Sequence, residues 1–373
     1  MMRIQDVKVV KEHNISRLSF NVCYKGTVEN VWFSTDAEQI AVDGEIFLSS
    51  LLLPAMRLGE TLVIDRAVSP PLMENVGKLQ DIFSSWYPKF QKIAIETEVS
   101  RESSGPSPTG VASFFSGGID SFYTLIKNNH EITTLVYVQG FDVWAHETEF
   151  LEKVHPRVVK IAAEFDKKLI TVRTNIHEFS DKFAEWAYEY HGCALASVAH
   201  LLSPVIRKIY IPSSCGYKYL LPYGSHLVAD QLWCTNKVSI VHDGEESTRP
   251  LKVKRVCENQ SALENLRVCL DRKYGNYNCG KCEKCKRTML NLYIYDKLQY
   301  CKTFSSELTP WKVARIRMNS DLVKAEYLET MKALKQYKPG SPYIWAVKIV
   351  LIRYEVNRLM KIVKGIFGIT EVS

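Results

Sequence analysis

From residue 111 onward, short unbroken apolar runs alternate with longer stretches whose apolar residues recur at helical spacing. Unbroken runs are typical of parallel strands covered on both faces, and their alternation with helices favours an α/β sheet. The predicted strands are 111–116, 133–140, 167–174, 207–214 and 237–244. We therefore expect a doubly wound parallel sheet, in which ligands bind beyond the carboxyl ends of the strands.

The segments on either side of this alternation have different patterns. Residues 1–99 mix short β-like runs with two helical patterns, which predicts a small α+β module. Residues 100–110 are rich in Ser, Pro and Gly, as expected of a linker. The pattern after residue 290 is mainly helical. The expected domains are 1–99, 111–290 and a helical C-terminal region over 291–373.

The composition is that of a globular protein. Apolar residues make up 46% of the 373 positions and charged residues 24%, which argues against wholesale disorder. The formal net charge is +7, and basic residues outnumber acidic ones between Lys302 and Lys364. This bias permits contact with phosphate-rich or acidic partners, but it favours a solvated basic helix surface.

No segment has the pattern of a signal peptide or a membrane span. The start of the chain lacks an apolar core and a cleavage site, and no uncharged apolar run reaches the roughly 18–20 residues that a bilayer requires. Residues 343–368 predict a basic amphipathic helix that docks on its own protein, on a partner or on a membrane surface. We expect a cytoplasmic protein whose ten cysteines are thiols or metal ligands.

The segment SGGIDS directly follows the first of the five strands and opens a helix. Gly117 and Gly118 let successive N–H groups converge on an anion, and the helix start adds further N–H groups. Ser116 and Ser121 offer hydroxyl groups. Asp120 would repel phosphate unless a cation such as Mg²⁺ lies between them. The turn therefore predicts a polyphosphate site; the alternative is a glycine turn that merely caps a helix.

Further polar residues follow the other strands. Gln139 and Asp142 lie at the end of the second strand, where Asp142 would assist metal binding or orient a ribose, or is a plain loop carboxylate. After the fifth strand, Arg249, or failing that Lys252, would stabilise negative charge in a transition state. We take Asp120 and Arg249 as the candidate catalytic residues.

The segment after the fourth strand combines aromatic and polar residues, as a site for a flat heterocycle or a sugar does. A long loop stabilised by its own aromatic side chains is the alternative. The candidate substrate-binding residues are Tyr217, Tyr223, His226 and Asp230.

Four cysteines have the spacing of a metal site. Three thiols at CxxCxxC spacing, with a fourth upstream, can close a tetrahedral site around Zn²⁺, and four protein ligands leave no open position for catalysis. A structural zinc ion is therefore expected, with an iron–sulfur cluster as the alternative. The four residues are Cys269, Cys279, Cys282 and Cys285.

The SGGIDS segment resembles the SGGxDS pyrophosphate loop of the ATP pyrophosphatase (PP-loop) superfamily. Together with the cysteine spacing, residues 111–290 look like 7-cyano-7-deazaguanine synthase, an enzyme of queuosine-type biosynthesis. The resemblance implies an adenine nucleotide alpha hydrolase-like fold that binds ATP, Mg²⁺ and Zn²⁺. It also implies a carbon–nitrogen ligase that adenylates the carboxylate of a 7-deazaguanine-type substrate, releases pyrophosphate and AMP, and forms an amide or nitrile.

The chain departs from this family where a substrate would be recognised, at YVQGFDVWAHETE and LLPYGSHLVADQLW. Some related proteins belong to antiviral defence operons, where a deazapurine would be joined to a protein partner. Three alternatives follow from the same loop and from the basic C-terminal region. They are an N-acetyl-sugar amidotransferase, an enzyme that modifies tRNA, and a non-catalytic nucleotide-binding subunit that docks a partner through its last helix.

Overall fold

The computed structural model describes residues 1–100, 108–269 and 277–366, with the side chains at 361, 362 and 364–366 left out. The strands are β1 (Met2–Glu12), β2 (Ile15–Tyr24), β3 (Thr27–Thr35), β4 (Leu62–Val63), β5 (Ile95–Glu96), β6 (Gly110–Phe114), β7 (Thr134–Gln139), β8 (Lys168–Thr174), β9 (Ile206–Pro212) and β10 (Ser239–Asp243). Most of the expected linker, residues 101–107, lies outside the described residues.

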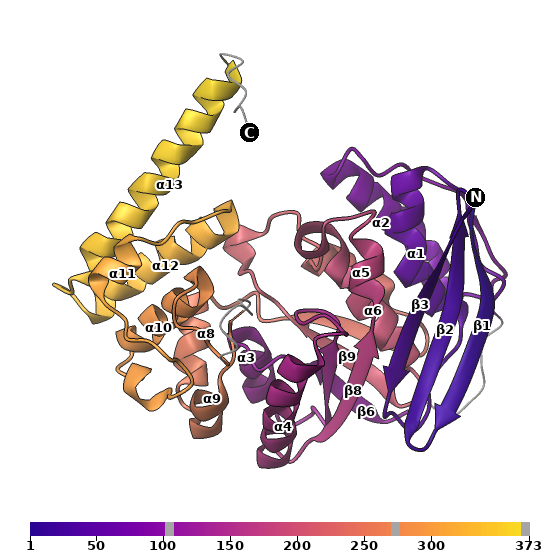
Figure 1. Ribbon diagram of the computed structural model, residues 1–373, viewed down its shortest axis with the longest axis horizontal. Helices are drawn as coiled ribbons and strands as arrows, with labels where there is room; N and C mark the ends of the chain where they lie inside the picture. The colour runs from indigo at the N-terminus through magenta and orange to yellow at the C-terminus, as the bar shows by residue number, and fades with distance from the viewer. Residues whose placement is uncertain (101–107, 270–276, 367–373) are drawn as a thin grey trace. The chain divides into compact units, whose positions relative to one another are not determined.

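Helical segments alternate with these strands and then continue alone (Figure 1). The first nine are α1 (Gly44–Leu58), α2 (Pro70–Trp86), α3 (Ile119–Lys127), α4 (Thr148–Glu164), α5 (Ile176–Ser180), η1 (Trp186–Tyr190), α6 (His191–Leu201), η2 (Tyr217–Tyr219) and α7 (Leu227–Asp230). They are followed by η3 (Gln231–Trp233), α8 (Arg249–Val256), α9 (Gln260–Asn265), α10 (Glu283–Ile294), η4 (Leu298–Tyr300), α11 (Pro310–Ala314), α12 (Asp321–Tyr337) and α13 (Tyr343–Ile366).

The strands form one ten-stranded, mostly parallel sheet in the order β10-β9-β6-β7-β8-β3-β2-β1-β4-β5. All five strands predicted after residue 110 are confirmed, and they pair in parallel with one another. The strand β6 has β7 and β8 on one side and β9 and β10 on the other, so the strand order reverses at β6. The fold is therefore α/β, as predicted.

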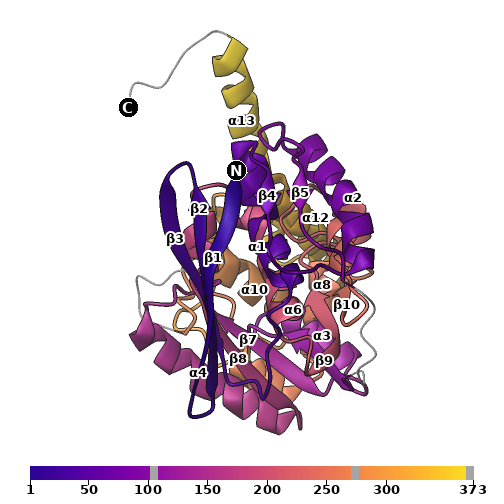
Figure 2. The same ribbon diagram turned by 90° about the vertical axis from the view of Figure 1, so that its right-hand side faces the viewer.

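The N-terminal strands extend this same sheet rather than forming a sheet of their own. The strand β3 pairs antiparallel with β8, and β2 and β1 follow it as a hairpin (Figure 1, Figure 2). The sequence pattern did not predict β1, because most of its side chains are exposed and its apolar residues do not alternate regularly. Pairing with β2, not hydrophobic burial, defines this strand.

Contacts divide the chain into two compact units that do not coincide with the expected domains. Unit 1 comprises Met1–Ser116, Thr124–Ser213 and Leu220–Gly244, and it contains the whole sheet. Unit 2 comprises Gly117–Tyr123, Ser214–Tyr219 and Glu245–Ser373. The N-terminal module thus shares a unit with the parallel strands, since the sheet joins them. The cysteine segment groups with the C-terminal helices.

Each unit has its own apolar core. In unit 1, α1 is buried from Gly44 to Met56 and packs against α6, with the hydroxyl groups of Ser49 and Ser197 3.0 Å apart between the two helices. In unit 2, α10, α11, α12 and α13 enclose a second core that includes Tyr327 and Leu334. The helix α8 packs against α10 and α12, which places the charged side chains of these three helices within reach of one another.

Candidate functional site

The glycine turn connects the end of β6 to the start of α3. Gly117 has φ +77°, a left-handed conformation that residues with a Cβ rarely adopt, and its carbonyl accepts a hydrogen bond from the Arg267 N–H at 2.8 Å. The first turn of α3 begins two residues later and supplies backbone N–H groups that have no partner within the helix. A helix start of this kind can bind an anion.

The two serines of the turn lie in different environments. Ser121 is buried, and its hydroxyl donates to the Gly118 carbonyl at 3.0 Å, within the first turn of α3. Ser116 is partly exposed and is the last residue of its segment in unit 1. Ser121 thus supports the turn in this arrangement, and the backbone N–H groups are the more direct donors for an anion.

Asp120, in the first turn of α3, contacts two cations from α8. Its Oδ2 accepts from Arg249 Nη1 at 2.8 Å, and its Oδ1 accepts from Lys252 Nζ at 3.2 Å. Arg249 and Lys252 are three residues apart, so they lie on one face of α8. Burial opposes ionisation of Asp120, but the charges of Arg249 and Lys252 outweigh it and lower the pKa of this carboxyl.

This ion pair continues into a buried network. Arg249 Nη2 lies 3.1 Å from Glu326 of α12, Glu326 also pairs with Arg287 of α10, and Arg287 Nε lies 3.1 Å from Glu283. All of these side chains except Glu283 and Asp120 are at most a tenth exposed. The network therefore fixes the position of Arg249, one of the two cations that contact Asp120.

Sequence reasoning identified Asp120, Arg249 and Lys252 but missed Glu326. The carboxylate of Glu326 reaches the network from a helix far along the chain, and no spacing rule connects it with the glycine turn. The available signal was weak: Glu326 shares a helix face with Thr330 and Ala333, which are both buried. A carboxylate on such a face generally has a buried cationic partner.

The four cysteines form a cluster that can hold a metal such as zinc. Their sulfur atoms all lie within 4.8 Å of one another, and the Cys269–Cys282 and Cys279–Cys285 sulfur pairs are both 3.9 Å apart. Tetrahedral zinc with Zn–S bonds of about 2.3 Å requires sulfur separations of about 3.8 Å. The observed separations fit this geometry and are far longer than a disulfide bond.

The loop around the cluster is shaped for sulfur ligands. The backbone N–H groups of Lys281 and Cys282 donate to the Cys279 sulfur at 3.3 and 3.2 Å, and Gly280, between Cys279 and Lys281, has φ +64°. Hydrogen bonds from the thiols of Cys282 and Cys285 lower the pKa of Cys269. The same contacts raise the pKa of Cys282 and Cys285. The N–H groups that donate to the Cys279 sulfur favour its binding to a thiophilic cation.

The other predicted nucleotide contacts belong to unit 1. Gln139 ends β7 and is partly exposed, while Asp142 is exposed in the loop that follows. Gly140 lies between them with φ +103°, and its N–H donates to the Val143 carbonyl at 2.8 Å. The loop is therefore a tight turn that leaves Asp142 at the surface of its unit.

The four predicted substrate residues do not share a unit. Tyr217 belongs to unit 2 and is exposed, whereas Tyr223, His226 and Asp230 belong to unit 1. Asp230 is fully buried, and its Oδ2 accepts from Ser225 Oγ and contacts His242 Nδ1, both at 2.6 Å. Its Oδ1 is also buried and has no hydrogen-bond partner among the described residues.

Aromatic rings surround this histidine–aspartate cluster. Tyr223 packs edge-on against His191 with ring centroids 5.1 Å apart, and Trp86 packs against His226 at 4.9 Å. Burial lowers the pKa of both histidines, which favours neutral imidazole rings. Sequence reasoning placed His226 and Asp230 in one site but did not include His191.

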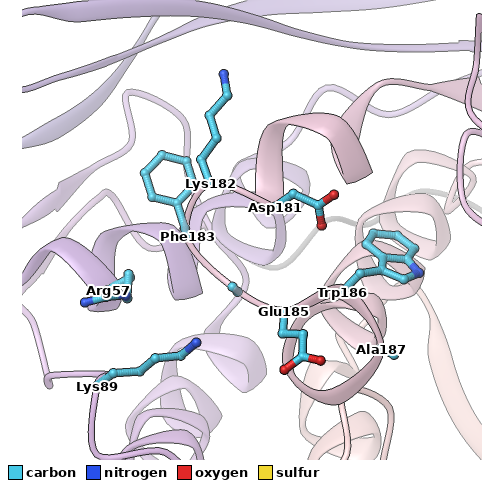
Figure 3. Close-up of a pocket in the computed structure, with 9 residues that line it drawn as sticks. Arg57, Lys89, Asp181, Lys182, Phe183, Glu185, Trp186 and Ala187 are labelled. Atoms are coloured by element: carbon cyan, nitrogen blue, oxygen red, sulfur yellow. The ribbon is translucent and has the colours of Figure 1, made fainter. Parts of the chain in front are cut away.

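Unit 1 also has a cavity of about 590 Å³ that contains none of the predicted site residues (Figure 3). It is lined by Arg57, Lys89, and the segment 181–187, which includes Trp186. Trp186 stacks on His177 with ring centroids 3.8 Å apart. The mixed charges of the lining, with Lys89 paired to Glu189 at 2.7 Å, give the cavity no clear ligand preference.

The described residues define an α/β protein with a mostly parallel sheet and a four-cysteine cluster that can hold a metal. Comparisons of the chain with protein-family models, with curated proteins and with solved structures found no match. Among the described helices, none is long and apolar enough to span a lipid bilayer.

Proposed function

We propose that the chain is an ATP-dependent carbon–nitrogen ligase that adenylates a substrate carboxylate. The glycine turn binds the β- and γ-phosphates of ATP, and pyrophosphate leaves from this site. The substrate is a 7-deazaguanine-type carboxylic acid, by resemblance to 7-cyano-7-deazaguanine synthase, and the nucleophile that follows is ammonia or another amine.

The observation that carries the proposal is the contact of Asp120 with both Arg249 and Lys252 at the start of α3. A helix start that follows a strand and a glycine turn supports phosphate binding. The strand order, which reverses at β6, supports a doubly wound sheet with its ligand beside that strand. The cations from α8 offset the charge of Asp120, so phosphate does not meet an unbalanced carboxylate.

Each residue has a distinct role in the proposed reaction. Backbone N–H groups from Gly118 onward hold the departing pyrophosphate, and Arg249 stabilises charge on the phosphates. When ATP is bound, Mg²⁺ would be held by phosphate oxygens together with Asp120, since Mg²⁺ is commonly bound through one or two carboxylates plus substrate phosphates. Catalysis comes mainly from positioning and charge stabilisation.

The proposed ligase reaction has two steps. A carboxylate oxygen attacks the α-phosphorus, the bond between this phosphorus and the oxygen that bridges to the β-phosphate breaks, and pyrophosphate leaves. The amine nitrogen then attacks the acyl carbon, the acyl–oxygen bond breaks, AMP leaves, and the amine releases a proton. A zinc ion in the cysteine cluster would be structural, because four sulfur ligands leave no open position.

The test measures AMP release from ATP with 7-carboxy-7-deazaguanine and ammonia. Asp120→Ala is expected to reduce AMP release by about 100-fold or more while the zinc content is unchanged. Lys254→Ala is the matched control, because Lys254 lies on the same helix α8 but is exposed. Wild-type activity in the folded Asp120→Ala variant would refute the role of the turn.

A further inference from the structure

The helix α13 is fixed to unit 2 through one face of its first turns. Ala346, Val347 and Val350 on this face are at most 1% exposed and pack in the core with α11 and α12. The hydroxyl of Tyr343 donates to the Leu308 carbonyl at 3.0 Å, and Glu355 pairs with Lys324 of α12. These contacts determine which face of α13 is turned away from unit 2.

The opposite face carries a continuous row of large apolar side chains at the surface of unit 2. Their exposed fractions range from 36% to 63%, whereas a row of this kind normally covers a core. Within unit 2, the helix extends past α11 and α12 (Figure 1). We name this row the apolar stripe; its members are Trp345, Ile349, Ile352, Val356, Leu359 and Val363.

The stripe is wide. Its members follow each other at alternating spacings of four and three residues, which keeps them on one side of the helix. Met360 is also half exposed and adds a further row beside Val356 and Leu359. The six members of the stripe have the two-position spacing of a coiled-coil seam, and Met360 widens the apolar face to about 100° of the helix circumference.

The charges on α13 are almost all positive. Between residues 343 and 366 the sequence has five basic residues, Lys348, Arg353, Arg358, Lys361 and Lys364, and a single acidic residue, Glu355. The Glu355 carboxylate already pairs with Lys324 and lies 3.1 Å from Arg358 Nη2. At 3.6 residues per turn, Lys348 and Arg353 fall on the two borders of the stripe. Lys348 is exposed, and Arg353 is partly exposed with its Nη1 donating to the Ile316 carbonyl at 3.3 Å. The surface that complements this helix is apolar in the middle and negative at its edges.

A second copy of the chain fits this pattern poorly. In a parallel helix pair, the positions that flank the seam would place Lys348 of one copy opposite Arg353 of the other, which is a repulsive pair. The positive net charge of each helix adds to this repulsion. Anionic lipid headgroups supply the opposite charge, and the acyl region accepts the apolar stripe.

We propose that the apolar stripe of α13 inserts into the headgroup region of an anionic lipid bilayer, with Lys348 and Arg353 at the level of the phosphates. The helix then lies in the plane of the membrane surface and tethers unit 2 there. This inference does not depend on the proposed nucleotide chemistry, because none of the residues that carry it belongs to the glycine turn or to the cysteine cluster.

The test is flotation of the full chain with phosphatidylcholine vesicles that contain about 30% phosphatidylserine or none. We expect binding to the anionic vesicles, at least about tenfold weaker binding to the neutral ones, and a further decrease as salt concentration rises. Ile352→Asp combined with Leu359→Asp should lower binding to the anionic vesicles at least about tenfold. Zinc content and circular dichroism verify that this variant is folded.

The matched control combines Val9→Asp and Val28→Asp, which change two comparably exposed valines in unit 1 and should leave vesicle binding unchanged. Lys348→Glu should weaken binding to the anionic vesicles and leave binding to the neutral ones unaltered. No binding to anionic vesicles, equal binding to both vesicles, or no effect of the double aspartate variant would each overturn the proposal. The proposal would also be overturned if the wild-type chain did not bind vesicles but formed a dimer in light scattering, and if the double aspartate variant dissociated this dimer.

Discussion

The cysteine cluster and the charged network at the glycine turn both lie in unit 2, yet the sequence predicts them unequally. The four cysteines fall between residues 269 and 285, so their sulfur atoms come from one short stretch of the chain. The network joins Asp120 to Arg249 and then to Glu326, three residues from distant parts of the chain. A local site can be inferred from spacing, whereas a site assembled by helix packing is visible only after folding.

Substitution of one residue should change stability differently in the two sites. The largest effect should follow substitution of a cysteine. Cys279→Ser should abolish stoichiometric metal binding and destabilise unit 2, because binding of a structural zinc ion contributes about 10 kcal/mol to zinc-dependent folds. Metal content and thermal unfolding of the purified chain measure this. Cys257→Ser is the control, since this buried cysteine is not part of the cluster. Full metal occupancy in the Cys279→Ser chain would contradict the assignment.

Loss of one carboxylate from the charged network should have the next largest effect. Glu326→Gln leaves Arg249 and Arg287 buried without their shared counter-charge, which should lower the free energy of unfolding by about 3–5 kcal/mol. Urea unfolding of the two chains measures the difference. Glu329→Gln, on the same helix but in contact with Lys332 and Tyr219, is the comparison. If the two substitutions lowered the free energy of unfolding equally, the stabilising role of the network would be contradicted.

A smaller effect should appear in the pH dependence of stability. The pKa of Asp120 is lower in the folded chain than its ordinary value of 3.8, so ionised Asp120 stabilises the fold at neutral pH. This contribution is present above pH 3.8 and is lost as the pH falls toward the folded-state pKa. Unfolding measured from pH 7 to pH 3 should show a steeper loss of stability for wild type than for Asp120→Asn. Parallel curves would contradict the ion pair.

The fold was more predictable than the site. The apolar runs of β6 and β7 predicted strands because both are buried over most of their length. The apolar runs of β8, β9 and β10 also predicted strands, although many of their residues are only partly buried. The exposed strand β1 gave no such signal. The turn around Gly117 was visible for a similar local reason, since its conformation restricts the residue type. The residues that Arg249 connects to Asp120 could not be predicted from the sequence, because they come together only when α8 packs against α12.

The substrate residues illustrate the same limit. Tyr217 and Asp230 lie within one short segment of the sequence, but they belong to different units, and only Asp230 is buried. The partners of Asp230, Ser225 and His242, lie on either side of it in the chain and meet at its carboxylate. The polar and aromatic residues of this segment predicted a substrate site, and the structure shows a buried polar cluster around Asp230; its role in substrate binding stays a prediction.

The central claim is that the glycine turn beside Asp120 binds the two terminal phosphates of ATP. Equilibrium dialysis of labelled ATP in the presence of Mg²⁺, with pyrophosphate or AMP as competitor, tests it most directly. We predict that the wild-type chain binds ATP, that pyrophosphate displaces it more effectively than AMP, and that Gly117→Val abolishes binding because valine disfavours a φ of +77°. Absence of ATP binding in the wild type, or unchanged binding in a Gly117→Val chain that retains its metal, would contradict the account.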